Sequence, residues 1–275
     1  MSVKPVIKAA TDVSEQEWAT RVELAALYRL ADHYGMSDII NQTICARVQG
    51  EPEHFLMCPR GRMFEEIRAS DLVKVDLDGN ALEGPGIWDG GEGWDRAAEA
   101  GERWISHGAV NLGRWIFETR PDRNFFIHVH DEEVQAVSAT EGRLQAVSQA
   151  AIYLGHLIGY LDYDFAEDDE YADLFCRTVA DHEIIIACNH GYYTLGRRAS
   201  EAFFRAYYLR EACSVQVKSA ATAAGLGERL RPVDPQRVAM LQDQMSASGH
   251  YAYDGSTEWA ALLRKLSRIC PDYAT

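Results

Sequence analysis

The sequence is short of positive charge and has no long hydrophobic run, and each absence argues against a class of protein. Its 275 residues include 27 Lys and Arg against 42 Asp and Glu, for a formal net charge of −15. Such an acidic surface repels phosphate backbones and anionic lipids. No apolar run approaches the ~20 residues that cross a bilayer, and the N-terminus is too polar for a secretory signal. We therefore expect a cytoplasmic protein with neither a nucleic-acid nor a membrane partner.

Paired cysteines, repeats and low-complexity tracts are also missing. The six cysteines stand far apart, with no C-x-x-C pair. This pattern predicts reduced cysteines in a core and excludes a disulfide framework or a zinc knuckle. With 47% hydrophobic residues the chain can bury a substantial core, which argues against disorder.

What the sequence does contain is an alternation of helical and strand patterns. The capping box Ser14-Glu15-Gln16-Glu17 opens a helix that Gly35 can close. Strands are expected at 42–50, 53–59, 71–80, 124–130, 182–191 and 192–196, and further helices at 107–120, 133–139, 148–157 and 199–225. No clear linker interrupts this order, so we predict one α/β domain over residues 1–230. Residues 231–275 are expected to form a helical tail that completes the domain or a subunit interface.

A Gly- and Trp-rich stretch, residues 83–104, separates the first strands from the next helix. It carries three tryptophans, Trp88, Trp94 and Trp104. Linkers seldom contain so many large aromatic side chains, so this stretch is expected to be an ordered loop or a lid.

Two histidines, His128 and His130, lie one residue apart at the end of the apolar run NFFIHVH. In an extended strand, residues i and i+2 point to the same face, so both imidazoles can reach one point. Zinc and iron accept such ligands. A lone H-x-H is weak evidence, because histidines in a core can also be satisfied by backbone carbonyls. A third histidine, His190, follows another apolar run in Asn189-His190-Gly191, at a strand end, and the three together favour a metal site.

Four segments resemble the class II aldolase/adducin superfamily: HFLMCPRGRMFEEIRASDLVKVDLDGN, NLGRWIFETRPDRNFFIHVHDEEVQAVSA, ACNHGYYTLGRRASEAF and YYLREACSVQV. The resemblance covers nearly all of residues 20–225. It implies a three-layer α/β/α sandwich around a mostly antiparallel sheet, assembled as a homotetramer with active sites between subunits. His128, His130 and His190 match the metal-binding histidines of the family's sugar-phosphate aldolases.

The chain departs from those aldolases where they carry acid–base groups. Their glutamate, nineteen residues before the first metal histidine, is replaced by Ala109. Their tyrosine from a neighbouring subunit, nineteen residues after the second, is replaced by Gln149. Their phosphate loop has a small hydroxyl residue before glycine, where this chain has Arg60-Gly61. These departures argue against a plain sugar-phosphate aldolase.

A different branch of the superfamily, the aminocoumarin-antibiotic oxygenases, resembles the chain in these departures. Those non-heme iron enzymes convert a prenylated 4-hydroxyphenylpyruvate to a prenylated 4-hydroxybenzoate with dioxygen. The resemblance implies Fe²⁺ on the three histidines, a carboxylic acid substrate paired with Arg60, and polar substrate contacts from Gln42, Thr43 and Gln149.

Three functions therefore remain open. The first is an iron(II) oxygenase that cleaves the side chain of an aromatic 2-oxo or 2-hydroxy acid. The second is a redox-neutral decarboxylase or aldolase that uses Zn²⁺, Mn²⁺ or Co²⁺ on a hydroxy- or oxo-acid. The third is a non-catalytic, adducin-like module, against which the three intact histidines count.

Overall fold

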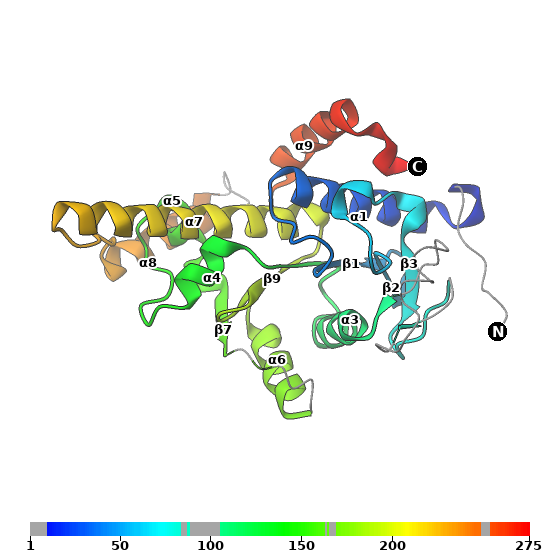
Figure 1. The fold of residues 1–275 in the computed structure, drawn as a ribbon, viewed down its shortest axis with the longest axis horizontal. Coiled ribbons are helices and arrows are strands. Elements are labelled where there is room, and N and C mark those ends of the chain that lie inside the picture. The colour runs from blue at the N-terminus through cyan, green and yellow to red at the C-terminus, as the bar shows by residue number, and fades with distance from the viewer. Residues whose placement is uncertain (1–9, 84–86, 89–104, 163, 165–168, 249–253) are drawn as a thin grey trace.

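A seven-stranded sheet forms the middle layer of the molecule. The computed structural model describes residues 10–83, 87–88, 105–162, 164, 169–248 and 254–275. The sheet has the strand order β3-β2-β1-β6-β9-β8-β7, with helices on both of its faces (Figure 1). Five of the six strand pairs are antiparallel, and only β7 with β8 is parallel. The predicted three-layer α/β/α sandwich with a mostly antiparallel sheet is confirmed.

Six of the seven strands overlap segments that the sequence pattern predicts; β2 begins two residues and β9 one residue before the predicted start. They are β1 (Thr43–Val48), β2 (Glu51–Met57), β3 (Val73–Asp76), β6 (Phe125–Val129), β8 (Ile184–Ala187) and β9 (Gly191–Gly196). Strand β7 (Ile158–Leu161) and helix α6 (Asp169–Asp181) were not predicted. A four-residue edge strand is too short to show a period, and its pairing with β8 is decided by packing. Two further short strands, β4 (Ile87–Trp88) and β5 (Ile105–Ser106), pair in parallel outside the main sheet.

The helices form two layers and an outer tail. They are α1 (Glu15–His33), α3 (His107–Thr119), α4 (Glu132–Ser138), α5 (Gln149–Leu154), α6, α7 (Ala199–Leu226), α8 (Pro235–Ser248) and α9 (Ser256–Ile269), with short 3₁₀ turns at 10–12, 64–66, 69–71, 155–157 and 271–274. The Ser14 hydroxyl accepts from the Glu17 amide at 3.1 Å, as the capping box predicts. The Glu17 carboxylate instead accepts from Arg21, one turn further along the same helix, and from Lys74, which tertiary packing brings to it.

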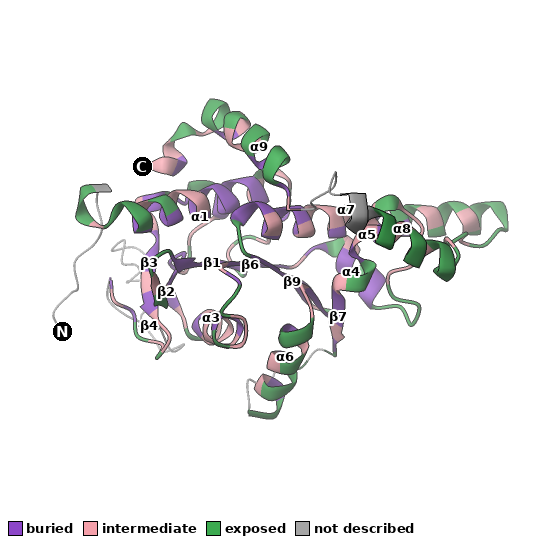
Figure 2. Ribbon diagram, turned by 180° about the vertical axis from the view of Figure 1, so that it is seen from behind, coloured by how far each residue is buried: buried purple, intermediate pink, exposed green. Residues whose placement is uncertain are grey.

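Alternation along the strands builds a core on each side of the sheet. Ile127 and Val129 of β6 pack with the α1 and α7 side chains, while Phe126 belongs to the cluster that α3 and α6 cover. Helix α3 approaches the sheet closely at Gly113, where an added Cβ would lie 2.6 Å from the Phe55 ring. In Figure 2 the strands and the sheet-facing side of α1 are buried, and α8 is mostly exposed. His128 therefore lies on the α3 side of the central strand.

The C-terminal helices lie outside the α1–α7 layer. Helix α9 contributes Trp259 and Leu266 to the core beside α1 and α7. A domain boundary at residue 230 stays a prediction. The predicted loop or lid at 83–104 falls mostly outside the described residues, as do Trp94 and Trp104. No helix in the described part of the chain combines the length and the apolarity that crossing a membrane requires.

Glu183, which directly precedes β8, ties three elements together through arginines. Its carboxylate accepts from Arg120 at 2.9 Å, from Arg123 Nε at 2.8 Å and from Arg205 at 2.9 Å. Burial alone would raise the pKa of Glu183. The hydrogen bond from Arg123 and the positive charge of Arg205 outweigh burial and lower this pKa to about 2. The ionised carboxylate is therefore a stabilising feature of the fold.

Glu183→Gln is expected to lower the free energy of unfolding by about 3 kcal/mol at neutral pH, since each pKa unit corresponds to ~1.4 kcal/mol. The pKa of Glu183 is depressed in the folded state, so its contribution is complete above the unfolded pKa and is lost as pH falls toward 2. Urea unfolding of both proteins between pH 7 and pH 3 measures the difference, which must shrink as pH falls. The exposed Glu228→Gln is the matched control, and an equal loss in that variant would contradict the assignment.

Candidate metal centre

The central strand β6 positions two of the three histidines. In the sheet register His128 lies opposite Thr43 of β1 and Tyr193 of β9. Its ring stacks on the Tyr193 ring, with centroids 4.2 Å apart and planes at 9°. His130 comes just after the last residue of β6. The i, i+2 spacing places both imidazoles on one side of the strand.

The turn between β8 and β9 brings in His190. Asn189 adopts a left-handed conformation with φ 62°, which asparagine tolerates better than most residues. Its amide donates to the Ser138 hydroxyl at 3.0 Å. At Gly191 an added Cβ would lie 2.5 Å from the Val129 carbonyl oxygen, so only glycine permits this approach to β6. The Asn-His-Gly sequence is thus the local reason that His190 lies beside the other two.

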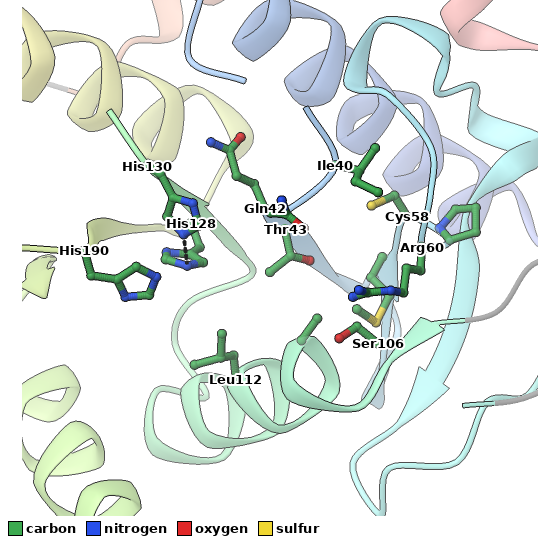
Figure 3. Close-up of a pocket in the computed structure, with 14 residues that line it drawn as sticks. Ile40, Gln42, Thr43, Cys58, Arg60, Ser106, Leu112, His128, His130 and His190 are labelled. Atoms are coloured by element: carbon green, nitrogen blue, oxygen red, sulfur yellow. Dashed lines mark hydrogen bonds between the residues drawn. The ribbon is translucent and has the colours of Figure 1, made fainter. Parts of the chain in front are cut away.

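The three imidazoles form one cluster. One potential ligand nitrogen from each residue lies within 4.8 Å of the others. The ring centroids are 4.9 Å apart for His128 and His130, 5.2 Å for His128 and His190, and 4.6 Å for His130 and His190. Figure 3 shows the three rings together at one end of a pocket. The three histidines that the sequence pattern singles out therefore lie together in the structure.

Hydrogen bonds on the outer side of the cluster fix which nitrogen carries the proton. His128 Nδ1 lies 3.1 Å from the Tyr192 carbonyl oxygen, which can only accept, so Nδ1–H donates. His130 Nδ1 lies 3.0 Å from the Asp38 carboxylate and donates in the same way. In the neutral rings both Nε2 atoms are then acceptors. They face each other at 3.3 Å, an arrangement that requires a proton or a cation between them.

A divalent metal fits this arrangement. Two nitrogens bound at ~2.1 Å to one tetrahedral ion lie about 3.4 Å apart. Nδ1 hydrogen bonds to a carbonyl and a carboxylate are the usual outer partners of metal-binding histidines. Burial, together with His130 and His190, holds the pKa of His128 well below its usual range, and burial lowers the pKa of His190 to about 4. Neutral imidazole is the form that binds a metal.

Asp38 was not singled out from the sequence. It lies 92 residues from His130 in a turn where its carbonyl accepts from the Asn41 amide at 3.1 Å. Ile39, within this turn, has a φ of 48°, which a β-branched side chain adopts only under strain. The turn therefore holds Asp38 on His130 at some conformational cost.

Asp38→Ala is expected to weaken divalent-metal binding about 10- to 100-fold, because His130 loses the partner that orients its ring. Asp38→Asn keeps an acceptor but removes the charge, so its loss should be smaller. Calorimetric titration with Zn²⁺ measures both affinities. Asp181→Asn, at an exposed site, is the control. Unchanged affinity in Asp38→Ala would remove Asp38 from the metal centre.

A pocket of about 190 Å³ opens from the histidines. Besides the three histidines it is lined by Ile40, Asn41, Gln42, Thr43, Met57, Cys58, Pro59, Arg60, Ser106, Ala109 and Leu112. Arg60 and Ser106 lie at the end opposite the imidazoles, with Gln42 and Thr43 between the two ends (Figure 3). The predicted substrate residues Gln42, Thr43 and Arg60 thus share one pocket with the histidines, while their role in binding stays a prediction.

Gln149 lies elsewhere. It is the first residue of α5, is exposed, and its amide donates to Tyr153. Within one chain it does not line the pocket. A contact between Gln149 and the substrate would require a neighbouring subunit, and it stays a prediction.

The described pocket residues include no carboxylate that could serve as a general base. Ala109 presents a methyl group on α3, and Cys58 is held as a thiol because burial raises its pKa to about 11. At the far end Ser106 is the N-cap of α3 and makes no side-chain cap hydrogen bond. The free amides of that helix start, together with Arg60, favour an anionic group. The pocket thus combines a metal-type donor set, an anion-binding end and apolar walls.

This fold and this cluster define an α/β/α protein with three histidines placed so that they could hold a divalent metal. The chain belongs to the family described as Class II Aldolase and Adducin N-terminal domain, whose model matches residues 22–217.

Individual relatives agree with this assignment. A Caulobacter vibrioides protein named for the class 2 aldolases is 31% identical over 98% of this chain and 97% of its own length. The crystal structure of an aldolase II superfamily protein from Pseudomonas syringae is 31% identical, with a TM-score of 0.83 over 96% of this chain and 98% of that one. Alpha-adducin of Rattus norvegicus is 36% identical over 90% of this chain, which spans 33% of adducin. L-fuculose 1-phosphate aldolase from Glaciozyma antarctica PI12 shares the fold, with a TM-score of 0.73 at 19% identity over 98% of this chain and 96% of that one.

Proposed function

We propose that the protein is a metal-dependent carbon–carbon lyase that acts on a small hydroxy- or oxo-acid, with decarboxylation as its best-fitting reaction. The observation that carries this proposal is the pocket itself. It places three imidazoles at one end, an arginine and a helix N-terminus at the other, and no carboxylate base among its described residues.

The size of the pocket limits the substrate. About 190 Å³ is below the roughly 300–1,000 Å³ that accommodates drug-sized ligands. A small acid suits this volume better than a prenylated aromatic acid does. In this proposal Arg60 and the start of α3 hold an acidic group that the product keeps, while Gln42 and Thr43 contact polar atoms between the two ends. Both atoms of the Gln42 amide are buried without a hydrogen-bond partner in the described part of the chain, so a substrate contact from this amide requires its side chain to turn toward the pocket.

A divalent metal on His128, His130 and His190 would supply Lewis-acid polarisation of a substrate carbonyl. The substrate would be a 3-oxo acid, in which the carbon that bears the departing carboxylate is bonded to the carbonyl carbon. The bond between that carbon and the carboxylate breaks, and its electron pair passes toward the carbonyl oxygen. A proton from water replaces the lost CO₂. Ala109 and Leu112 give the reacting end an apolar wall, which disfavours a charged carboxylate relative to neutral CO₂. No protein base is needed, whereas aldol cleavage must remove a hydroxyl proton.

The second candidate is the iron(II) oxygenase of an aromatic 2-oxo or 2-hydroxy acid. The same lack of a described base favours it, since in oxygen chemistry the cofactor performs the difficult step. Three histidine ligands would also leave room on a divalent ion for a substrate acid and for dioxygen. Both proposed functions include assembly as a homotetramer, because Gln149 would reach a substrate pocket only from another subunit.

The deciding experiment is elemental analysis of anaerobically purified protein, followed by parallel assays of CO₂ release and oxygen uptake. The substrates are small 3-oxo acids that carry a second acidic group, for the lyase, and substituted 4-hydroxyphenylpyruvates and aromatic 2-hydroxy acids, for the oxygenase, each with Zn²⁺, Mn²⁺, Co²⁺ or Fe²⁺. CO₂ release without oxygen uptake supports the lyase. Iron-dependent oxygen uptake would replace it with the oxygenase. A protein that binds no metal and turns over no acid would favour the adducin-like, non-catalytic module.

A further inference from the structure

A second cavity, of about 440 Å³, lies between α7 and α9. It shares no lining residue with the metal pocket. Helix α9 lies on the outer side of the α1–α7 layer, away from the sheet (Figure 1). The cavity is therefore separated from the proposed reaction by a helical layer, and the proposed function assigns it no role.

Aromatic rings form most of its walls. Helix α7 contributes four rings at positions i, i+1, i+4 and i+5, namely Phe203, Phe204, Tyr207 and Tyr208. The end of α1 adds Tyr34, whose ring is 5.2 Å from Tyr207, and α9 adds Trp259, 6.1 Å from Phe203. Such walls favour a flat apolar or aromatic ligand through edge and face contacts. A ligand that is polar throughout would lose more free energy by giving up its hydration than it would gain from contacts with these rings.

The charges at the rim select the sign of the ligand. Lys265 is half-buried, with its ammonium 4.9 Å from the centre of the Tyr34 ring, and Arg268 follows one turn later on α9. Arg268 donates to the Arg264 carbonyl, and neither cation has a carboxylate partner in the parts of the chain that are described. The acid of this rim, Glu258, lies seven residues before Lys265, about 10 Å along the helix. One end of the cavity is therefore cationic in a chain of net charge −15.

Two buried donors in the lining are unsatisfied. Ser200 Oγ and Trp259 Nε1 have no hydrogen-bond partner among the described residues, and both residues are more than nine-tenths buried. Each of these two atoms exposes less than 1 Å², so neither faces the open cavity and a ligand bound there does not reach them. The aromatic rings and the two cations are therefore the features that select the ligand.

We propose that the cavity between α7 and α9 is a second small-molecule site for an apolar monocarboxylate, with its aromatic body against the ring wall that α7 and Trp259 form and its carboxylate near Lys265 and Arg268. No covalent step is involved. The site is distinct from the metal centre, so it binds its ligand whether or not the proposed lyase activity is correct.

The test uses three probes of the same shape and different charge: 1-naphthoate, 1-naphthalenemethanol and 1-naphthylmethylamine. Isothermal titration of the full-length protein is expected to rank their affinities in that order, with naphthoate at least about tenfold tighter than the amine. The double variant K265A/R268A should lose this preference for the anion while retaining the affinity for the neutral alcohol. K218A/R264A removes the same charge from exposed positions outside the cavity and should bind like the parent.

A filling variant, Leu262→Trp, separates this cavity from other surfaces and should weaken all three probes. Zn²⁺ affinity is measured for each variant and is expected to stay unchanged, which shows that the fold and the metal centre are intact. Equal binding of the three probes, or naphthoate affinity unchanged in both K265A/R268A and Leu262→Trp, would overturn the proposal. Probe affinity that falls as protein concentration rises would also overturn it, because a second copy of the chain would then cover the cavity.

Discussion

Replacing His128 with alanine is expected to abolish stoichiometric binding of a divalent metal while the protein stays folded. Four-ligand structural zinc sites bind with about 10–16 kcal/mol, so one ligand accounts for roughly 3 kcal/mol, or about two orders of magnitude in affinity. His190→Ala should have the same effect, because its imidazole closes the cluster from the turn between β8 and β9. Both losses follow from the geometry of the cluster, whichever metal is loaded.

Elemental analysis after dialysis measures the metal content, and thermal unfolding with and without Zn²⁺ measures how much bound metal stabilises the folded protein. At a metal concentration of about 100 Kd the parent gains about 2.7 kcal/mol of stability, and the variants should gain almost none. His156→Ala, at an exposed histidine outside the cluster, is the control. A His128→Ala protein with one metal per chain would refute the assignment.

Arg60→Ala is expected to raise KM for the acidic substrate about 10- to 100-fold with a smaller change in kcat. A charge-assisted hydrogen bond contributes about 1.5–3 kcal/mol, and a contact that is present equally in ground and transition states appears in KM. The substrate is the one identified by the CO₂ and oxygen assays. Stability should change little, because Arg60 is only partly buried at the pocket mouth.

The matched control for Arg60 is Arg62→Ala. Arg62 lies two residues further along the chain and pairs with Glu66 at 2.7 Å on the surface, outside the metal pocket. The control should have the KM of the parent. If Arg60→Ala also has the parental KM, the anionic end of the substrate lies elsewhere, and the free amides at the start of α3 become the remaining candidate.

Local periodicity made much of the fold predictable. The alternation in NFFIHVH places Ile127 and Val129 on one face of β6 and Phe126 and His128 on the other, as the two core clusters confirm. Gly35 ends the first helix region with a φ of 68°, as predicted. The strand β7 is a short parallel edge strand whose pairing depends on β8 being in place. Helix α6 does carry a helical signal, with Tyr171, Phe175 and Val179 at i, i+4 and i+8, and was overlooked.

The outer contacts of the metal centre were not predictable in the same way. Asp38 reaches His130 across 92 residues, and no local motif marks it. The Glu17 carboxylate accepts from Arg21 on its own helix and from Lys74, 57 residues away, which the fold brings to it, and so does not complete the capping box. Side-chain partners of this kind are selected by packing between distant segments, which sequence spacing does not encode.

By itself the sequence determined the strand and helix pattern, the acidic surface, and the spacing that aims His128 and His130 to one side with His190 at another strand end. These features depend on residues a few positions apart, where backbone geometry is nearly fixed. Tertiary structure alone decided that Asp38 orients His130 and that the start of α3 lies across one small pocket from the histidines. Those distances are set when the sheet and its helical layers pack together.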